Sequence, residues 1–308
     1  MTLFLYFILF VISLGVLLYA SDRFVNSAEN IGLSFGVSPF IIGVTIVAFG
    51  TSLPELATSI ASVYAGSSEI VIGSVMGSNI TNILLILGTT AFLGKGIKLD
   101  FDVMDIDMPF LFCSAFLLFF VLRDLDINYM ETGIFLLALV VFLVNSLKTE
   151  KADETMRREK RGMDYAVLIG ASILVYFGAT YTISSLEEIA VILSIPPHII
   201  ALTVIALGTS LPELIVSMAA IRRGKHAMAV GNVLGSNIFN TYAVVGISSL
   251  FGDISIPDNA VGFDMLIMMV ATILFGVMCI GGHISRWEGG MLVVFYLYFL
   301  SENVGAML

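Results

Sequence analysis

Charged residues are scarce in this chain of 308 residues: Asp, Glu, Lys and Arg make up 12% of it, whereas hydrophobic residues make up 58%. Soluble domains carry about 25% charged residues, so the composition excludes a water-soluble fold. Ligands for soft metals are scarce as well. The two cysteines, Cys113 and Cys279, fall in apolar runs and are expected to be core residues. The three histidines fall at predicted helix ends or in loops, which disfavours a zinc or copper centre.

Long apolar runs separated by turn signals fill most of the chain. They predict ten helices, near residues 3–34, 39–65, 69–93, 106–122, 128–147, 164–193, 197–222, 226–251, 262–281 and 287–304. Helices of about 20 to 30 residues are long enough to cross a bilayer. The sequence therefore predicts an all-α integral membrane protein, multi-pass in the cell membrane, with the lipid bilayer around it and no nucleic-acid partner.

The two halves of the chain repeat each other. The hexapeptide GTSLPE at Gly50–Glu55 recurs letter for letter at Gly208–Glu213, 158 positions later. At the same offset, 12 of the 18 residues in Pro39–Leu56 are identical, and so are 7 of the 10 residues in Gly73–Asn82. Chance similarity between apolar helices does not reproduce Thr, Ser, Pro, Glu and Asn together. The chain is therefore a duplicated membrane unit.

Ten charged residues crowd into positions 148–162 (KTEKADETMRREKRG), between the fifth and sixth predicted helices. The predicted organisation is a first five-helix repeat at 1–147, a solvated linker at 148–162 and a second five-helix repeat at 163–308, within one membrane domain. Because each half has an odd number of helices, the halves should cross the membrane in opposite senses, as inverted repeats. If the linker is cytoplasmic, the loops on its side carry 12 of the 14 Lys and Arg, and only Arg23 and Arg123 lie elsewhere. This excess predicts a cytoplasmic linker and two extracellular termini.

Each copy of GTSLPE places a helix breaker and an ionisable residue inside an apolar run. Pro54 has no N–H for the carbonyl of Gly50, so the helix is expected to break there and to free the carbonyls from Ala48 to Thr51. Glu55 would lie at a depth where an ionisable group costs on the order of 3 kcal/mol or more. Free carbonyls, hydroxyls and a carboxylate together form an oxygen-rich pocket for a hard cation. The alternative is a proline-kinked helix with a protonated or paired glutamate, and the duplication argues against it.

The helix after each hexapeptide carries a second shared motif, GSVMGSNITN at 73–82 and GNVLGSNIFN at 231–240. Its two glycines are four residues apart and are expected to let helix backbones approach closely. The serine that follows the second glycine and the last asparagine of the motif are also four residues apart, and both side chains offer oxygens for cations. The alternative role for them is hydrogen bonding between helices. These candidate donors are Ser78, Asn82, Ser236 and Asn240.

Together, the paired motifs resemble the two alpha-repeats of the calcium:cation antiporter superfamily, and within it the prokaryotic sodium/calcium exchangers. The resemblance spans essentially the whole chain. It implies ten transmembrane helices in two inverted five-helix repeats with broken helices at the centre, where long first and sixth helices slide past a central cluster of ion sites. The ligands that it implies are Glu55 and Glu213 as the acidic pair, Thr51, Ser52, Thr209 and Ser210 through hydroxyls and carbonyls, Ala48 and Ala206 through carbonyls, and Ser78, Ser236, Asn82 and Asn240 as supporting oxygens.

The expected function is secondary antiport, in which Na⁺ entry drives Ca²⁺ extrusion by alternating access. Two carboxylates balance one Ca²⁺, and spare hydroxyl and carbonyl oxygens suit further Na⁺ ions, so exchange is expected to be electrogenic. Several relatives, including potassium-dependent ones, have Asp where this chain has Asn240, and without that carboxylate transport is expected to be independent of K⁺. No enzymatic activity and no cofactor are expected. Ca²⁺ and Na⁺ are the expected substrates, and the protein is expected to work as a monomer.

Two alternatives stay open on the sequence alone. A proton/Ca²⁺ exchanger would cycle the same two glutamates between protonated and Ca²⁺-bound states, although proton-coupled branches of the superfamily typically carry a Gly-Asn-Ala-rich acidic motif in place of Gly-Thr-Ser. A cation channel would use the same oxygen lining, but inverted repeats with broken helices favour alternating access. An intramembrane protease is excluded, because no G-x-S-x-G or H-E-x-x-H motif and no buried histidine accompany the acids.

Overall fold

The computed structural model describes residues 3–99, 107–149, 162–193, 210–256 and 262–305, which are mostly helical. The first half contains α1 (Leu3–Ser34), α2 (Pro39–Ile42), η1 (Gly43–Val47), α3 (Ala48–Tyr64), α4 (Glu69–Ile80), η2 (Thr81–Leu87), α5 (Gly88–Leu93), β1 (Ile97–Lys98), α6 (Asp107–Val121), η3 (Leu122–Asp124) and α7 (Tyr129–Thr149). The second half contains α8 (Gly162–Ile192), α11 (Leu211–Arg222), α12 (His226–Phe239), η6 (Asn240–Val245), α13 (Gly246–Ser248), α14 (Phe263–Ile280), β2 (His283–Ile284) and α15 (Arg286–Gly305).

Within the described residues, consecutive helical elements join into ten helices, which confirms the predicted membrane fold. Six helices in the described residues are long and apolar enough to cross a membrane. The observed bounds of the first three helices differ from the predicted ones by at most one residue. Two predictions lie partly outside the described residues: the linker, whose edges belong to α7 and α8, and the helix at 197–222, of which the structure describes α11. The division into domains at these edges stays a prediction.

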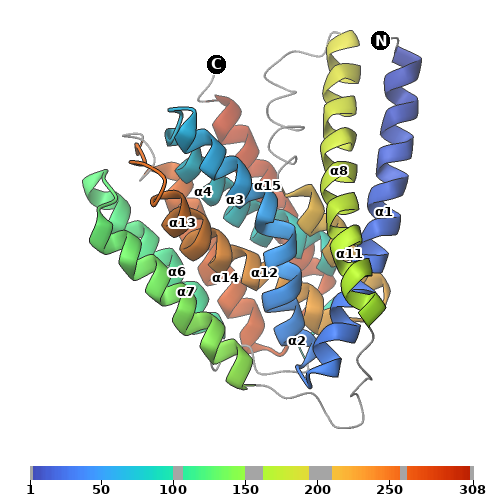
Figure 1. Cartoon of the computed structure of the whole chain (residues 1–308), viewed down its shortest axis with the longest axis horizontal. Coiled ribbons are helices and arrows are strands. Elements are labelled where there is room, and N and C mark those ends of the chain that lie inside the picture. Colours follow the sequence, from blue (N-terminus) through green and yellow to red (C-terminus); the bar gives the residue numbers. More distant parts are fainter. Residues whose placement is uncertain (1–2, 100–106, 150–161, 194–209, 257–261, 306–308) are drawn as a thin grey trace.

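The start of α1 and the end of α15 lie at the same end of the helix bundle (Figure 1). The end of α7 and the start of α8, which flank the predicted linker, lie at the opposite end. α1 and α8 run side by side along one edge of the bundle, whereas α6 and α7 lie at the other edge. Two five-helix units that cross a membrane in opposite senses produce this placement of the chain ends.

α1 and α8 are in close contact along their length. A Cβ built on Gly178 would lie 3.0 Å from the Cα of Leu17, so the two backbones nearly touch there. One turn away, Thr182 Oγ1 donates to Ser13 Oγ at 3.0 Å. Close backbone approach and a buried hydroxyl pair hold these two long helices to each other.

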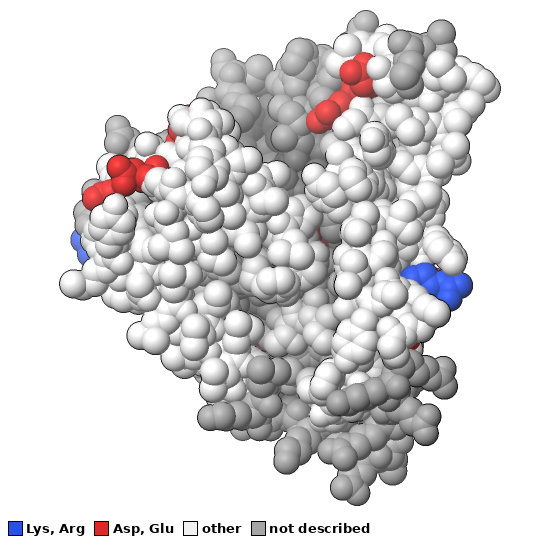
Figure 2. Space-filling model, viewed as in Figure 1, with Lys and Arg blue, Asp and Glu red and all other residues white. Residues whose placement is uncertain are grey.

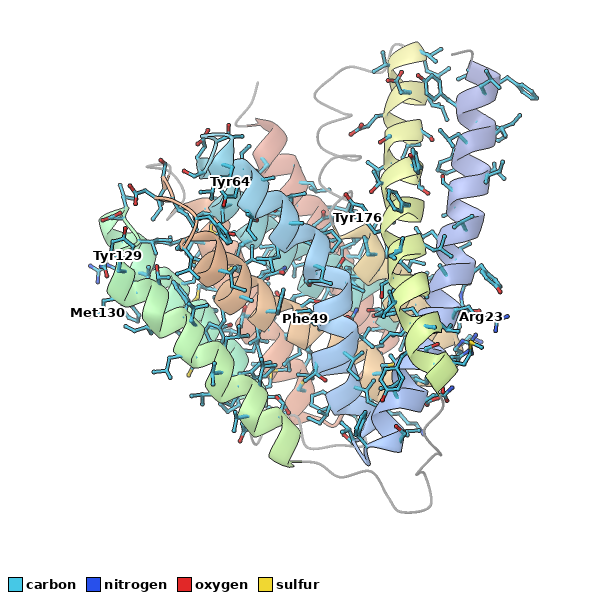
Figure 3. All side chains as sticks on the ribbon, in the orientation of Figure 1. Arg23, Phe49, Tyr64, Tyr129, Met130 and Tyr176 are labelled. Carbon is cyan, nitrogen blue, oxygen red and sulfur yellow. The ribbon has the colours of Figure 1, made fainter. Side chains whose placement is uncertain are left out.

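The outer surface of the bundle is apolar. Figure 2 shows a largely uncharged face, with acidic groups toward the end of the molecule that carries both chain ends. Large hydrophobic side chains point outward, such as Ile169 at 62% exposure and Val277 at 58%. Figure 3 shows Tyr129 and Met130 at the outer edge of the helices. A hydrocarbon environment would cover such a surface, as expected for a multi-pass membrane protein.

The helix interruption expected at Pro54 lies earlier in the chain and takes a milder form. α3 continues through Pro54, and the helix deviates instead in η1, a π-helical segment that ends directly before Ala48. There the Ala48 N–H bonds to the carbonyl of Gly43, five residues back. A π-helical turn shifts the register of the backbone ahead of the proline, which allows the helix to continue. Two further π-helical segments, η2 and η6, lie in the helices that follow each hexapeptide.

The glycines of the second motif mark a close helix crossing in the second half. A Cβ on Gly231 would lie 2.9 Å from Val44 N, and a Cβ on Gly235 would lie 2.7 Å from Val44 Cα. α12 therefore packs on η1 backbone to backbone, as the packing interpretation of these glycines predicted. Around the two glycines of the first motif, no atom lies within 4 Å of the equivalent position in the described part of the chain. Close packing is therefore confirmed for the second copy only.

Candidate cation site

The residues predicted to bind cations lie where the two repeats cross. α3 carries Thr51, Ser52 and Glu55, while Ser210 directly precedes α11 and Glu213 lies in its first turn. α3 packs against α12 and η6, and α11 packs against η2. The described candidates, each at most 3% exposed, are Ala48, Thr51, Ser52, Glu55, Ser78, Asn82, Ser210, Glu213, Ser236 and Asn240. Ala206 and Thr209 lie outside the described residues.

Direct contacts join the two repeats within this cluster. Ser52 Oγ donates to Glu213 Oε1 at 3.2 Å. Thr51 Oγ1 donates to Ala48 O and to Asn232 Oδ1, each at 3.3 Å. Glu55 lies close enough to Glu213 for the two carboxylates to interact electrostatically. The fold thus brings together two glutamates that are 158 positions apart in the chain.

Most side-chain oxygens of the cluster receive no hydrogen bond from the residues that the structure describes. Buried polar atoms are normally paired, and each exception costs about 1–3 kcal/mol. Bound cations would satisfy these oxygens and balance the two carboxylates, so the donor set fits hard cations as substrates. Among the described candidates of this cluster, the side-chain oxygens buried without a hydrogen-bond partner are Oε1 and Oε2 of Glu55, Oε2 of Glu213, Oγ of Ser78, Ser210 and Ser236, and Oδ1 of Asn82 and Asn240.

The middle asparagines of the second motif also form hydrogen bonds, and one of these bonds joins two helices. Asn79 Nδ2 donates to Thr241 Oγ1 at 3.1 Å and so links α4 to η6. Asn237 Nδ2 donates to Val233 O at 2.6 Å within α12. These two residues stabilise the helices through their amide nitrogens, while their own Oδ1 atoms, like the oxygens of the flanking serines and asparagines, accept no hydrogen bond from the described residues.

Asn232 belongs to the site although the motif analysis did not select it. Its side chain is fully buried on α12, where Oδ1 accepts from Thr51 and Nδ2 donates to Ser217 Oγ at 2.9 Å. Because the one hydroxyl hydrogen of Thr51 is directed toward Asn232 Oδ1 and Ala48 O, the lone pairs of Thr51 are free to face a cation. The available sequence signal was a mismatch, since the residue equivalent to Asn232 in the first repeat is Ser74.

We expect Asn232→Ser, which installs the side chain of the equivalent position in the first repeat, to weaken the apparent affinity for the driving cation about fivefold. The lost hydrogen bond to Thr51 contributes about 1 kcal/mol. The measurement is the cation-concentration dependence of transport in proteoliposomes. Asn79→Ser is the matched control, because its hydrogen bond leads to Thr241 and away from Thr51. An unchanged concentration dependence in Asn232→Ser would show that Asn232 does not orient Thr51.

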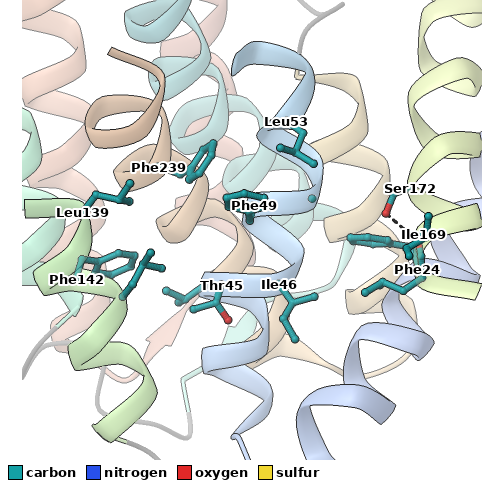
Figure 4. Close-up of a pocket in the computed structure, with 14 residues that line it drawn as sticks. Phe24, Thr45, Ile46, Phe49, Leu53, Leu139, Phe142, Ile169, Ser172 and Phe239 are labelled. Carbon is teal, nitrogen blue, oxygen red and sulfur yellow. Dashed lines mark hydrogen bonds between the residues drawn. The ribbon is translucent and has the colours of Figure 1, made fainter. Parts of the chain in front are cut away.

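The outward face of α3 has the opposite character. There, an apolar pocket of about 400 Å³ lies between α3, α7 and α8 (Figure 4). Phe49 and Leu53, which line it, are 46% and 41% exposed, whereas Thr51, Ser52 and Glu55 on the same helix are buried. α3 therefore directs its oxygens into the bundle and its apolar side chains outward, and the pocket in Figure 4 is not the cation site.

Comparison with known proteins points to one family. The family model described as sodium/calcium exchanger protein matches residues 5–148 and 163–303. The sodium/calcium exchanger MaX1 of Methanosarcina acetivorans is 34% identical, over 96% of this chain and 97% of its own length. The putative antiporter CaxA of Alkalimonas amylolytica is 34% identical, over 93% of this chain and 94% of its own length. A solved structure of the sodium-calcium exchanger NCX_Mj, soaked with zero Na⁺ and Ca²⁺, matches with a TM-score of 0.84 and 30% identity, over 98% of this chain and all of that one.

Proposed function

This chain belongs to the sodium/calcium exchanger family, and from that premise we propose that it is a secondary antiporter in which Na⁺ entry drives Ca²⁺ out of the cell. The observation that carries the proposal is the buried pair Glu55 and Glu213, which the two repeats supply and which lies among side-chain oxygens that mostly accept no hydrogen bond from the described residues. A buried carboxylate pair without cationic partners is costly unless cations or protons neutralise it. Binding of the transported cations would neutralise the two carboxylates.

Competition for shared oxygens would make the exchange obligatory. Glu55 and Glu213 together carry two negative charges, which one Ca²⁺ or two Na⁺ balance. Binding one set of ions therefore displaces the other. Two flanking oxygen groups could hold additional Na⁺, one formed by Ala48, Thr51, Ser52 and Ser236 and the other by Ala206, Thr209, Ser210 and Ser78.

Alternating access needs a part that moves against the cation site. We assign this role to α1 and α8, which hold each other through Gly178 and the pair Thr182–Ser13 and lie together along one edge of the bundle. Helices that contact each other closely can slide past the central helices as one body. Ions would then reach the site from one side of the membrane at a time.

The deciding experiment is Ca²⁺ uptake into proteoliposomes loaded with Na⁺, compared with liposomes that carry only a pH gradient. We expect an outward Na⁺ gradient to drive uptake and a pH gradient alone to fail, and the opposite result would establish the proton/Ca²⁺ alternative. Channel activity would appear as Ca²⁺ flux without any counter-ion gradient.

Transport is expected to run without K⁺. Asn82 and Asn240 are both buried and neutral, so among the described residues the site holds two carboxylates and no third one to help bind K⁺ beside Ca²⁺. The measurement is the rate of Na⁺-driven Ca²⁺ uptake with K⁺ replaced by choline on both sides. A strict K⁺ requirement would place the protein in the potassium-dependent branch.

Exchange is also expected to move net charge, because the two flanking oxygen groups suggest more than two Na⁺ for each Ca²⁺. Each surplus charge is worth about 2.3 kcal/mol per 100 mV. An interior-negative potential should therefore accelerate Na⁺ entry and Ca²⁺ extrusion. The check is Na⁺-driven Ca²⁺ flux in proteoliposomes held at different K⁺-valinomycin potentials, and a rate indifferent to voltage would favour electroneutral exchange.

We propose that the protein lies in the cell membrane with both termini outside and the charged linker inside. Most Lys and Arg then lie in cytoplasmic loops. We also propose that one chain suffices for transport, since both glutamates and the oxygens around them come from the two repeats of a single chain.

A further inference from the structure

A second polar feature lies away from the cation site, in a pocket of about 570 Å³ between α1, α5 and α11. Leu18 and Leu93 form part of its wall and are 40% and 58% exposed, so the pocket opens on the outer surface of the bundle. From Leu214 to Arg222, the pocket follows α11 over an axial rise of about 12 Å at 1.5 Å per residue. It is therefore an elongated, mostly apolar groove with a charged end.

Guanidinium groups gather at that charged end. Arg222 and Arg223 line the pocket at the last turn of α11. Arg23 stacks over the ring of Tyr19, another wall residue, with 5.1 Å from its guanidinium carbon to the ring centroid. Figure 3 shows Arg23 at the outer edge of the bundle. Across the ranges that the structure describes, no hydrogen bond or ion pair engages Arg222, and one acid, Asp22, lines the pocket.

An arginine cluster at the mouth of an apolar groove has the chemistry of a phospholipid site. Its depth places the arginines near the level of the lipid headgroups, because Arg222 lies nine residues, or about 14 Å, from the buried Glu213. Basic residues in that position attract anionic lipids, and the groove below them suits an acyl chain. We propose that this pocket binds an anionic phospholipid, with its phosphate at Arg222 and Arg223 and one acyl chain along Leu18, Leu93 and Met218.

A lipid in this pocket would contact α1 as well as α11. Arg223 already binds this helix, through Asp22 at 3.1 Å and Asn26 at 2.5 Å, and Lys225, two residues further along the chain, forms an ion pair with Glu29. These contacts join α1 to the loop between α11 and α12. A lipid seated between α1 and α11 adds a bridge across the same boundary, and it neutralises the positive charge that Asp22 leaves uncompensated.

Native mass spectrometry of the delipidated protein tests the proposal directly. The probes are phosphatidylglycerol and phosphatidylcholine with identical acyl chains, and inorganic phosphate as competitor. We expect wild-type protein to prefer phosphatidylglycerol and inorganic phosphate not to displace it, because free phosphate lacks the acyl chain. Arg222→Gln should weaken phosphatidylglycerol binding about fivefold, as loss of one basic residue near a lipid surface does. Phosphatidylcholine binding should not change.

Further variants separate the two parts of the site. Arg222→Lys, which keeps the charge, should retain the lipid preference, and Lys98→Gln, which removes an exposed cation on β1 outside the pocket, should also retain it. Met218→Trp fills the groove and should weaken binding of both lipids roughly tenfold. Equal binding of the two lipids by wild type, or wild-type preference in Arg222→Gln, would overturn the proposal, and so would displacement by inorganic phosphate. The readout is lipid binding, so its outcome does not depend on which ions the protein exchanges.

Discussion

Ca²⁺ transport is expected to disappear when Glu213 is replaced by glutamine, and likewise when Glu55 is. Either change halves the negative charge at the site while leaving its shape nearly intact. Removing one charge from a buried cluster that holds a cation costs about 3 kcal/mol, or roughly a hundredfold in affinity. The measurement is Ca²⁺ uptake by purified variants in proteoliposomes, together with Ca²⁺ binding by isothermal calorimetry.

The thermal stability of the glutamate variants should distinguish a role in transport from a role in folding. Without ions, Glu213→Gln removes a buried charge whose Oε2 accepts no hydrogen bond from the described residues, so the variant should be at least as thermally stable as wild type. The matched control is Glu69→Gln, which changes an exposed acid in the first turn of α4 and should leave transport unchanged. Wild-type Ca²⁺ flux in Glu213→Gln would show that transport does not need the carboxylate pair. Failure of the variant to fold would show that Glu213 has a structural role.

Gly235→Ala is expected to destabilise the whole bundle, by about 1–3 kcal/mol or more. Its new methyl group would lie 2.7 Å from Val44 Cα and 2.8 Å from Ala48 Cβ. The backbone of η1 cannot move away as a flexible side chain could, so α12 would have to shift. Because Ser236 is the next residue on α12 and Ala48 begins α3, the shift would also disturb the cation site. The measurement is the thermal denaturation temperature in detergent, with transport of the surviving folded fraction.

Gly15→Ala is the control for that experiment. Gly15 lies inside α1 and is exposed, and no atom of the described residues lies within 4 Å of the position that an added Cβ would take. Alanine is the better helix former, so Gly15→Ala should be neutral or slightly stabilising. Equal stability of the Gly235 and Gly15 variants would show that the crossing of α12 and η1 tolerates an added methyl group, and that the second-motif glycines have another role.

Part of the site could be predicted from the sequence because the duplication compares the chain with itself. Glu55, Glu213 and the polar residues around them are identical at one offset, whereas the surrounding apolar residues drift. The same comparison did not select Asn232, because this site residue differs between the two repeats. The structure identified it through its hydrogen bonds to Thr51 and Ser217.

The position of the helix irregularity near Pro54 could not be predicted from the sequence alone. The missing N–H of Pro54 and the clash of its ring are local facts, and they predict an interruption nearby. Where the helix adapts depends on neighbours: α12 presses against η1 through Gly231 and Gly235, and the π-helical turn forms in that stretch. The sequence alone does not contain that contact, because it joins segments from the two halves of the chain.

The sequence by itself determined that this is a ten-helix membrane protein with inverted repeats and an acidic residue in each half, because hydropathy, helix length and self-similarity are properties of the chain read in order. Only the tertiary structure decided that the two glutamates share one cluster, that Ser52 of one repeat binds Glu213 of the other, and that arginines at the end of α11 line one groove with residues of α1. Each of these pairings joins distant segments, and its geometry depends on how whole helices pack.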